Sequence, residues 1–408
     1  MNQFDKSIMV RQSHSFKIKK SNTTTERKKV RYIVSSILGI ITLSLFFLFH
    51  TTQRIITLPD DGQVMRSQPP KFVTVVLPSV VNTKGRKKRL DAITSTWGPA
   101  SNAIYITHPD ALSDYSLKTP SENSFPQIMP VLPNEASEEE GVPRLKYVIS
   151  EVYTKYNPEF AFFVNDHTFV IPQHLCSFLK KNNFQPTKHL YAGHALRPSN
   201  QKGMKYAFNS GASGYFLSRL TMRVLTEKWN GGDQVCSGSG NKWLQGNPGL
   251  LIAQCLKSIG VDPVDTRDKM KRHIFHAFGL VRVVKKEIDE WYINKHESLY
   301  EIMGNDKVFH HELQKGKDCC SPETSSFHYV EWAETSALWA TLNNIQSRGA
   351  DMIEDKELQQ FMIDKWPSEQ RDVGGYAHNL PPVTKQEIWS DLLHVVKSIA
   401  PKNVDHYC

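Results

Sequence analysis

The sequence predicts an α/β domain with a mostly parallel sheet covered by helices, preceded by a membrane anchor. Three observations lead to this prediction. Short β-branched or aromatic runs alternate with amphipathic helical patterns between residues 72 and 164, which favours a parallel sheet with helices packed on it. The run Phe160–Val164 is wholly apolar, as is typical of a strand buried on both faces. A long uncharged stretch, 32–49, follows a basic tail.

The positive charge is concentrated at the N-terminus. Residues 1–31 hold nine Lys or Arg against two acidic residues, which gives +7, whereas the remaining 377 residues carry only +2 of the total of +9. A nucleic-acid-binding protein needs a basic face on its folded part. The distribution therefore excludes a nucleic-acid partner from the predictions.

The segment Tyr32–Phe49 is predicted to cross a membrane. Its eighteen residues carry no charge, and about 20 apolar residues are needed to span the hydrocarbon core as a helix. The alternative is a cleaved signal peptide, but the run is long, its basic leader is long, and no small-residue cleavage site follows closely. The positive-inside rule places the N-terminus in the cytosol and the rest of the chain in the lumen. We therefore predict a single-pass type II signal anchor.

The predicted organisation has five parts. They are a cytosolic basic tail (1–31), a transmembrane signal anchor (32–49), a polar stem (50–70), an α/β domain (71–330) and a helical C-terminal extension (331–408).

The first half of the domain alternates strands and helices. A β-branched run that stops at Pro78 predicts the first strand, and Leu90, Ile93 and Trp97 recur at helical spacing. A segment rich in Pro, Ser and Glu is read as a loop. In order, we expect a strand at Phe72–Leu77, a helix within Lys84–Trp97, a strand at Ala103–Thr107, a loop over 108–141 and a helix over 142–156.

The apolar run Phe160–Val164 ends in the polar triplet Asn165-Asp166-His167. In open α/β sheets, ligands bind beyond the C-terminal ends of the strands. The triplet therefore predicts a binding site, and the alternative is a core strand followed by a polar turn.

The second half has weaker patterns. A small-residue segment, Asn209–Gly214, is expected to open a helix, and its glycines would let a ligand approach the backbone; the alternative is a tight turn. The other expected elements are an extended piece at Tyr191–Gly193, a helix at Leu250–Ile259, and helical segments at Trp332–Ile345, Glu354–Trp366 and Thr384–Ile399.

Six cysteines are present, an even number that fits a disulfide-permitting lumen. No CxxC pair occurs, which argues against a zinc ribbon. Their spacing leaves the pairing open. They are Cys176, Cys236, Cys255, Cys319, Cys320 and Cys408.

The motifs together resemble glycosyltransferase family 31, which contains the core 1 β1,3-galactosyltransferase and its non-catalytic chaperone relative. Asn165–Val170 stands where that family has an aspartate triplet followed by Thr-Tyr-Val. Five motifs occur in the family's order, which makes coincidence improbable. They are Asn165–Val170, Asn209–Tyr215, Asp265–Asp268, Phe275–Phe278 and, as one two-part motif, Cys319–Ser321 with Ser326–Val330.

The resemblance implies a GT-A fold, in which a Rossmann-like sheet binds a UDP-sugar. It implies inverting transfer of a hexose, most simply galactose, to a glycan hydroxyl in β1,3 linkage, with O-linked GalNAc on a glycoprotein as acceptor. The expected location is the Golgi or ER membrane, and a homodimer is possible for this family. A divalent cation would neutralise the departing diphosphate as a Lewis acid, and a carboxylate would take the acceptor's proton.

By the same resemblance, Asn165, His167 and His328 would hold the metal. Neither of the two triplet positions is a carboxylate, and amide and imidazole donors suit manganese better than magnesium. The loss of anionic charge predicts weak or absent manganese binding.

The family's catalytic base falls at Gly249, counting back from Cys255, so no base residue is predicted. The nearest carboxylates in sequence are Asp233, Asp262 and Asp265. The resemblance also implies a disulfide between Cys236 and Cys255. The expected base and the aspartate triplet are both replaced, so a catalytically inactive relative, a chaperone or a glycan-binding protein, is the alternative function.

Contacts to the nucleotide sugar are expected from Arg144, Lys146, Asp166, Gly211 and Tyr215, and from the basic run Arg86–Arg89. For each cation the alternative is ordinary surface charge.

Overall fold

The computed structural model describes residues 71–78, 85–107, 127–130, 141–197, 206–241, 244, 246–290, 292, 314–366 and 380–402. The chain divides into two units, Met1–Arg66 and Ser67–Cys408, and all described residues belong to the second. The predicted tail, anchor and stem lie outside the described residues. Among those that are described, no helix has the length and apolar character needed to span a bilayer. The anchor at 32–49 therefore stays a prediction.

A six-stranded sheet forms the centre of the described chain, in the order β3-β2-β1-β4-β9-β6. β1 pairs in parallel with β2 and β4, and β2 with β3, whereas β9 is antiparallel to β4 and β6. The sheet is therefore mixed but rich in parallel pairs, as predicted. Its strands are β1 (Phe72–Leu77), β2 (Ala103–Thr107), β3 (Gln127–Pro130), β4 (Phe160–Asn165), β6 (Tyr191–Gly193) and β9 (Tyr215–Ser218).

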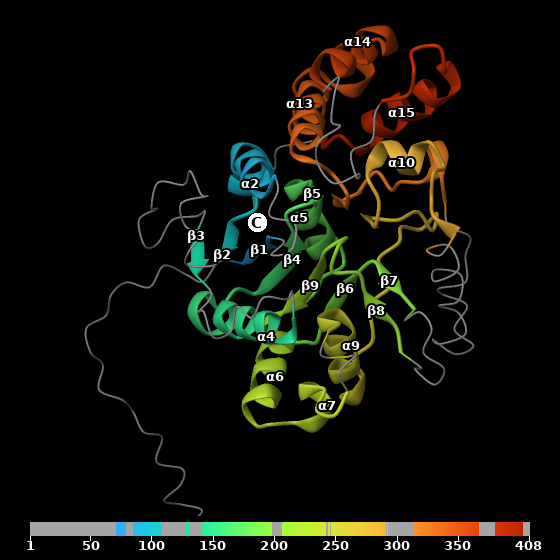
Figure 1. The fold of residues 1–408 in the computed structure, drawn as a ribbon. Coiled ribbons are helices and arrows are strands. Elements are labelled where there is room, and N and C mark those ends of the chain that lie inside the picture. The colour runs from blue at the N-terminus through green and yellow to red at the C-terminus, as the bar shows by residue number, and fades with distance from the viewer. Residues whose placement is uncertain are drawn as a thin grey trace, which may run out of the picture. The chain divides into compact units, whose positions relative to one another are not determined.

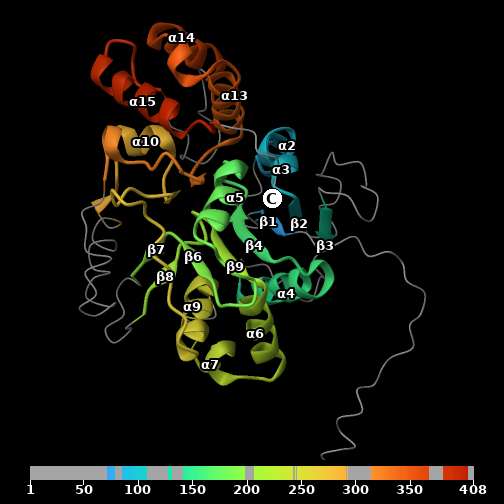
Figure 2. The ribbon, with the colours of Figure 1, turned by 180° about the vertical axis from the view of Figure 1, so that it is seen from behind.

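Helices cover both faces of this sheet (Figures 1 and 2). Successive side chains of a strand point to opposite faces, so Phe162 and Val164 join one hydrophobic core while Val75 and Phe163 join the other. The helices are α2 (Arg86–Ser95), α3 (Trp97–Ala100), α4 (Val142–Glu151), α5 (Pro172–Lys181), α6 (Arg219–Asn230), α7 (Gln234–Ser237), α9 (Pro248–Ser258), α10 (Leu280–Val284), α13 (Trp332–Arg348), α14 (Asp355–Lys365) and α15 (Gln386–Ile399).

Each core has its own set of helices. Residues of α4, α6 and α9 pack on the face that contains Val75, and residues of α2, α5, α10, α13, α14 and α15 belong to the core on the other face. The predicted C-terminal helical segments are therefore confirmed, and they pack against the domain. Shorter helical turns are a π-helical turn at Val152–Tyr156 and 3-10 turns at Gly316–Asp318 and Ala350–Met352.

Two small sheets accompany the large one. The first has the order β10-β11-β5, and in it Phe327 lies opposite Phe169 in an antiparallel pair. This pairing brings a late segment of the chain beside the end of β4. The strands are β5 (Phe169–Val170), β10 (Phe275–His276) and β11 (Ser326–Phe327), and in the second sheet β7 (Ala195–Leu196) and β8 (Phe208–Asn209).

Two sequence predictions about secondary structure are wrong. The predicted loop 108–141 contains β3, a four-residue edge strand too short to show a periodic pattern. Tyr215–Ser218 is a strand rather than the start of a helix, since it is inserted between β4 and β6. The helix α6 begins at Arg219, directly after this strand. Ser218 is its N-cap residue, and the Ser218 hydroxyl accepts a hydrogen bond from Thr221 N–H.

Candidate functional site

The candidate site lies at the C-terminal end of β4 and consists of Asn165, Asp166, His167 and His328; we call it the strand-tip site. The segment Asn209–Gly214 lies beside this site, as shown by the hydrogen bond that the Thr168 hydroxyl donates to the Ala212 carbonyl at 2.9 Å. The segment Ser326–Val330 also lies beside it, since Val330 N–H donates to the His167 carbonyl at 3.0 Å. Three motifs far apart in sequence therefore meet at one place.

The side-chain amide of Asn165 has a fixed orientation. Its Oδ1 accepts from the backbone N–H of His167 at 3.0 Å and lies 2.8 Å from the hydroxyl of Thr168, whose one proton it shares with the Ala212 carbonyl. Its Nδ2 therefore faces the Nε2 atom of His328, at 3.1 Å. Because an amide nitrogen only donates, His328 presents an unprotonated Nε2 to it.

His328 is 5% exposed. Burial, together with the nearby His167, lowers the pKa of His328 to about 3, and a hydrogen bond with the Ala277 backbone offsets part of this shift. The imidazole of His328 is therefore uncharged near pH 7, which agrees with its role as acceptor.

Asp166 and His167 belong to a buried charge network of Arg89, Asp166, His167 and Glu331. Arg89 Nε donates to Asp166 Oδ2 at 2.8 Å. Glu331 Oε1 lies 3.2 Å from His167 Nδ1, and Glu331 Oε2 lies 3.9 Å from Arg89 Nη1. No member of the network is more than 7% exposed. The carboxylate of Asp166 therefore faces Arg89 of α2.

The three predicted metal ligands lie near one another, but the donor atoms of Asn165 and His328 already face protein partners. Asn165 Oδ1 takes two hydrogen bonds and His328 Nε2 faces an amide N–H, while the Nδ1 atom of His167 faces Glu331. Within the described part of the chain, no group of three or more His, Cys, Asp or Glu is arranged to hold a metal. This donor geometry does not fit a divalent cation, and manganese stays a prediction.

The chain is distantly related to a galactosyltransferase. Over 208 residues it is 26% identical to the glycoprotein-N-acetylgalactosamine 3-beta-galactosyltransferase 1 of Xenopus laevis, and the matched region covers 50% of this chain and 49% of that protein. The chain thus spans about half the length of this relative. No protein-family model matches the chain. The mixed, parallel-rich α/β sheet fits a glycosyltransferase fold.

The two predicted cations of α4 lie in different surroundings. Arg144 is buried, and its Nη1 donates to the Pro78 carbonyl at 3.0 Å, beside the end of β1. Lys146 lies over the ring of Trp229 at 5.9 Å, and burial lowers its pKa. Of the two, only Arg144 is therefore placed beside a strand end of the central sheet.

Gly211 and Tyr215 also differ. Gly211 is exposed, and a Cβ built on it would meet only the Tyr215 ring, at 3.9 Å. Tyr215 is 3% exposed and stacks on Phe163, with Tyr191 edge-on. Burial raises the pKa of Tyr215 above its usual range. Tyr215 is thus a core residue, whereas Gly211 leaves space for a ligand.

The position of the family's base, Gly249, lies in the first turn of α9. A Cβ built there would lie 3.9 Å from the Asn209 carbonyl, an ordinary contact. The three carboxylates nearest to Gly249 in sequence form ion pairs with lysine or arginine side chains. These ion pairs are Asp233–Lys228, Asp262–Lys257 and Asp265–Arg267.

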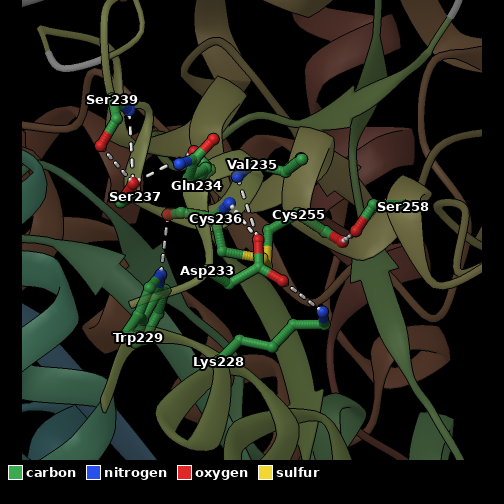
Figure 3. The surroundings of a disulfide bond; sticks show 10 residues. All are labelled: Lys228, Trp229, Asp233, Gln234, Val235, Cys236, Ser237, Ser239, Cys255 and Ser258. Carbon is green, nitrogen blue, oxygen red and sulfur yellow. Dashed lines mark hydrogen bonds and ion pairs between the residues drawn. A yellow bond between two sulfur atoms is a disulfide. The ribbon is translucent and has the colours of Figure 1, made fainter. Parts of the chain in front are cut away.

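The disulfide that the resemblance implied, Cys236–Cys255, is present and joins α7 to α9 (Figure 3). Asp233 caps α7 beside it by accepting from the backbone N–H groups of Val235 and Cys236. The structure also decides pairings that the sequence left open, since Cys319 and Cys320 are bonded to each other and Cys176 is disulfide-bonded too.

Sequence reasoning missed two residues beside the site, Glu331 and Glu334. Glu334 is 0% exposed, and burial, with the neighbouring Glu331, raises its pKa well above the usual value. Acidic residues in the first turn of a helix usually face solvent and the helix dipole, so composition gave no reason to bury them. The sequence position of Glu331 could have indicated its place near the site, because it directly follows the last motif, Ser326–Val330.

Proposed function

We propose that this chain is a glycosyltransferase-like protein of the secretory pathway that binds a glycan or a glycosyltransferase client without transferring sugar. The proposal is supported above all by the contact between Asn165 and His328, since it directs an N–H group at the imidazole lone pair that a metal would need. The replaced base at Gly249 supports the same conclusion.

The expected loss of activity is large. A missing general base lowers a rate by about 10²–10⁴-fold. Losing a Lewis-acid metal removes several kcal/mol of further transition-state stabilisation. A protein with both changes would have lost sugar transfer and would keep only the binding of a glycan or a client protein. With the predicted anchor, it would act on the lumenal side of the Golgi or ER membrane.

A second candidate is an active hexosyltransferase, and the relationship to a galactosyltransferase favours it. In this case the reaction would be inverting transfer of galactose from UDP-galactose to O-linked GalNAc in β1,3 linkage. The proton acceptor would then have to come from a residue other than the one at position 249.

A transfer assay separates the two candidates. The purified full-length chain is incubated with labelled UDP-galactose, manganese and a GalNAc-bearing peptide, and the Xenopus relative is run beside it as a positive control. We expect no labelled product from this chain. Product that disappears with EDTA would establish the second candidate and overturn the first.

A restoration experiment tests the reason for inactivity. Asn165→Asp, His167→Asp and Gly249→Asp together return the carboxylates, and position 249 has room for a side chain. The matched control carries the two strand-tip changes with Gly249→Asn, which has the same size but cannot accept the proton. Activity in the first variant that is absent from the second is the expected result.

A further inference from the structure

Glu331 is a buried carboxylate whose oxygens accept no hydrogen bond from the described residues. It is 1% exposed, and its nearest cationic partners are His167 Nδ1 at 3.2 Å and Arg89 Nη1 at 3.9 Å. Buried polar groups are normally hydrogen-bonded, and an unsatisfied one costs about 1–3 kcal/mol, more when charged. The position of this side chain therefore needs an explanation beyond stability.

Helix capping does not explain it. Glu331 is the N-cap residue of α13, but its side chain makes no capping hydrogen bond. Its carbonyl serves the helix by accepting from Thr335 N–H at 2.8 Å. The carboxylate is directed at the strand-tip site instead.

The two groups that Glu331 faces are suited to an anion. The guanidinium of Arg89 has five N–H donors, and its Nε donates to Asp166 at 2.8 Å. Guanidinium groups match carboxylates and phosphates alike. Both Arg89 and His167 lie beside the C-terminal end of β4, where sheets of this kind bind their ligands.

We propose that Arg89 and His167 form an anion site that the Glu331 carboxylate fills from within the chain, and that this carboxylate weakens the binding of phosphate-bearing ligands such as UDP at the strand-tip site. The contact is autoinhibitory, since a diphosphate has to compete with this carboxylate for Arg89 and His167. This inference deepens the proposed function and rests on the strand tip being a nucleotide-sugar site.

The test measures binding of three probes to the purified full-length chain by calorimetry. The probes are UDP, inorganic phosphate and uridine, which lacks phosphate. In Glu331→Gln we expect UDP and phosphate to bind at least about tenfold more tightly than in the unaltered chain, because like charges juxtaposed in a site cost several kcal/mol. Uridine should bind equally to both.

Two variants serve as controls. Glu331→Asp keeps the charge and should bind UDP as weakly as the unaltered chain. Glu334→Gln changes a buried carboxyl of the same helix turn, whose pKa burial raises well above its usual value, and it should leave UDP binding unchanged. A thermal melt confirms that each variant is folded, and Glu331→Ala replaces Glu331→Gln if the latter does not fold.

The proposal is overturned if folded Glu331→Gln and Glu331→Ala bind UDP within about twofold of the unaltered chain, or if uridine gains as much as UDP. These outcomes differ from failure of the proposed function, which would appear as sugar transfer by the unaltered chain.

Discussion

Arg89 and Asp166 are 77 positions apart in sequence, yet Arg89 Nε lies 2.8 Å from Asp166 Oδ2. Both side chains are at most 1% exposed. The contact joins α2 to the turn after β4 and so connects the first helix of the domain with the strand-tip site. A buried pair of this kind makes each partner dependent on the other, because an unpaired charge in the interior is costly.

Replacing Arg89 by Met should therefore destabilise the protein by about 3–5 kcal/mol, since the buried Asp166 loses its guanidinium partner. Urea unfolding followed by circular dichroism measures the loss. Adding Asp166→Asn should recover part of it. The control is Lys257→Met, which breaks the exposed pair with Asp262 and should cost no more than about 1 kcal/mol. Equal losses in the two single variants would contradict the prediction.

The disulfide Cys236–Cys255 closes a sequence separation of 19 residues. In the chain-entropy model a loop of this length is worth about 3 kcal/mol. The double variant Cys236→Ser and Cys255→Ser should lose about this amount of unfolding free energy under non-reducing conditions. If the unaltered chain and the variant unfold at the same denaturant concentration, the bond does not stabilise this part of the fold.

Gly214 occupies a left-handed conformation, with φ +84°, and a Cβ there would come within 2.3 Å of Phe162. Gly214→Ala should therefore combine backbone strain with overpacking, together about 2–4 kcal/mol. Gly232→Ala is the matched control, because Gly232 has φ +69° but nothing within 4 Å. Its loss should be the backbone part alone, about 1–2 kcal/mol. A Gly214→Ala variant as stable as Gly232→Ala would show that the Phe162 contact relaxes without cost.

Glu334 should make stability fall as pH rises. Its pKa in the folded chain is well above its value of 4.5 in a free side chain, so the folded state holds a proton that the unfolded state has lost. Stability from this group is fully present below pH 4.5 and decreases above it, by at most about 1.4 kcal/mol per pH unit. Glu334→Gln should remove this decrease and be more stable than the unaltered chain at pH 7, but not at pH 4.5. Parallel stability curves between pH 4.5 and 7 would contradict the assignment.

Local patterns predicted much of the fold. The runs at Phe72–Leu77 and Ala103–Thr107 became strands with those bounds, because β-branched side chains and flanking breakers act over a few residues. Periodicity also placed the C-terminal helices. It failed for β3 and β9, since a four-residue strand is defined by its neighbours in the sheet rather than by its own sequence.

The sequence by itself determined which groups are available at the site. It shows an amide and an imidazole where a metal-binding triplet would have carboxylates, and a glycine at position 249. Only the tertiary structure decided how those groups are used. It turned Asn165 toward His328, buried Tyr215 in the core, and brought Glu331 to His167 and Arg89. The physical reason is that residue types and spacing fix local conformation and chemistry, whereas hydrogen bonds and ion pairs between distant segments depend on how the strands and helices pack.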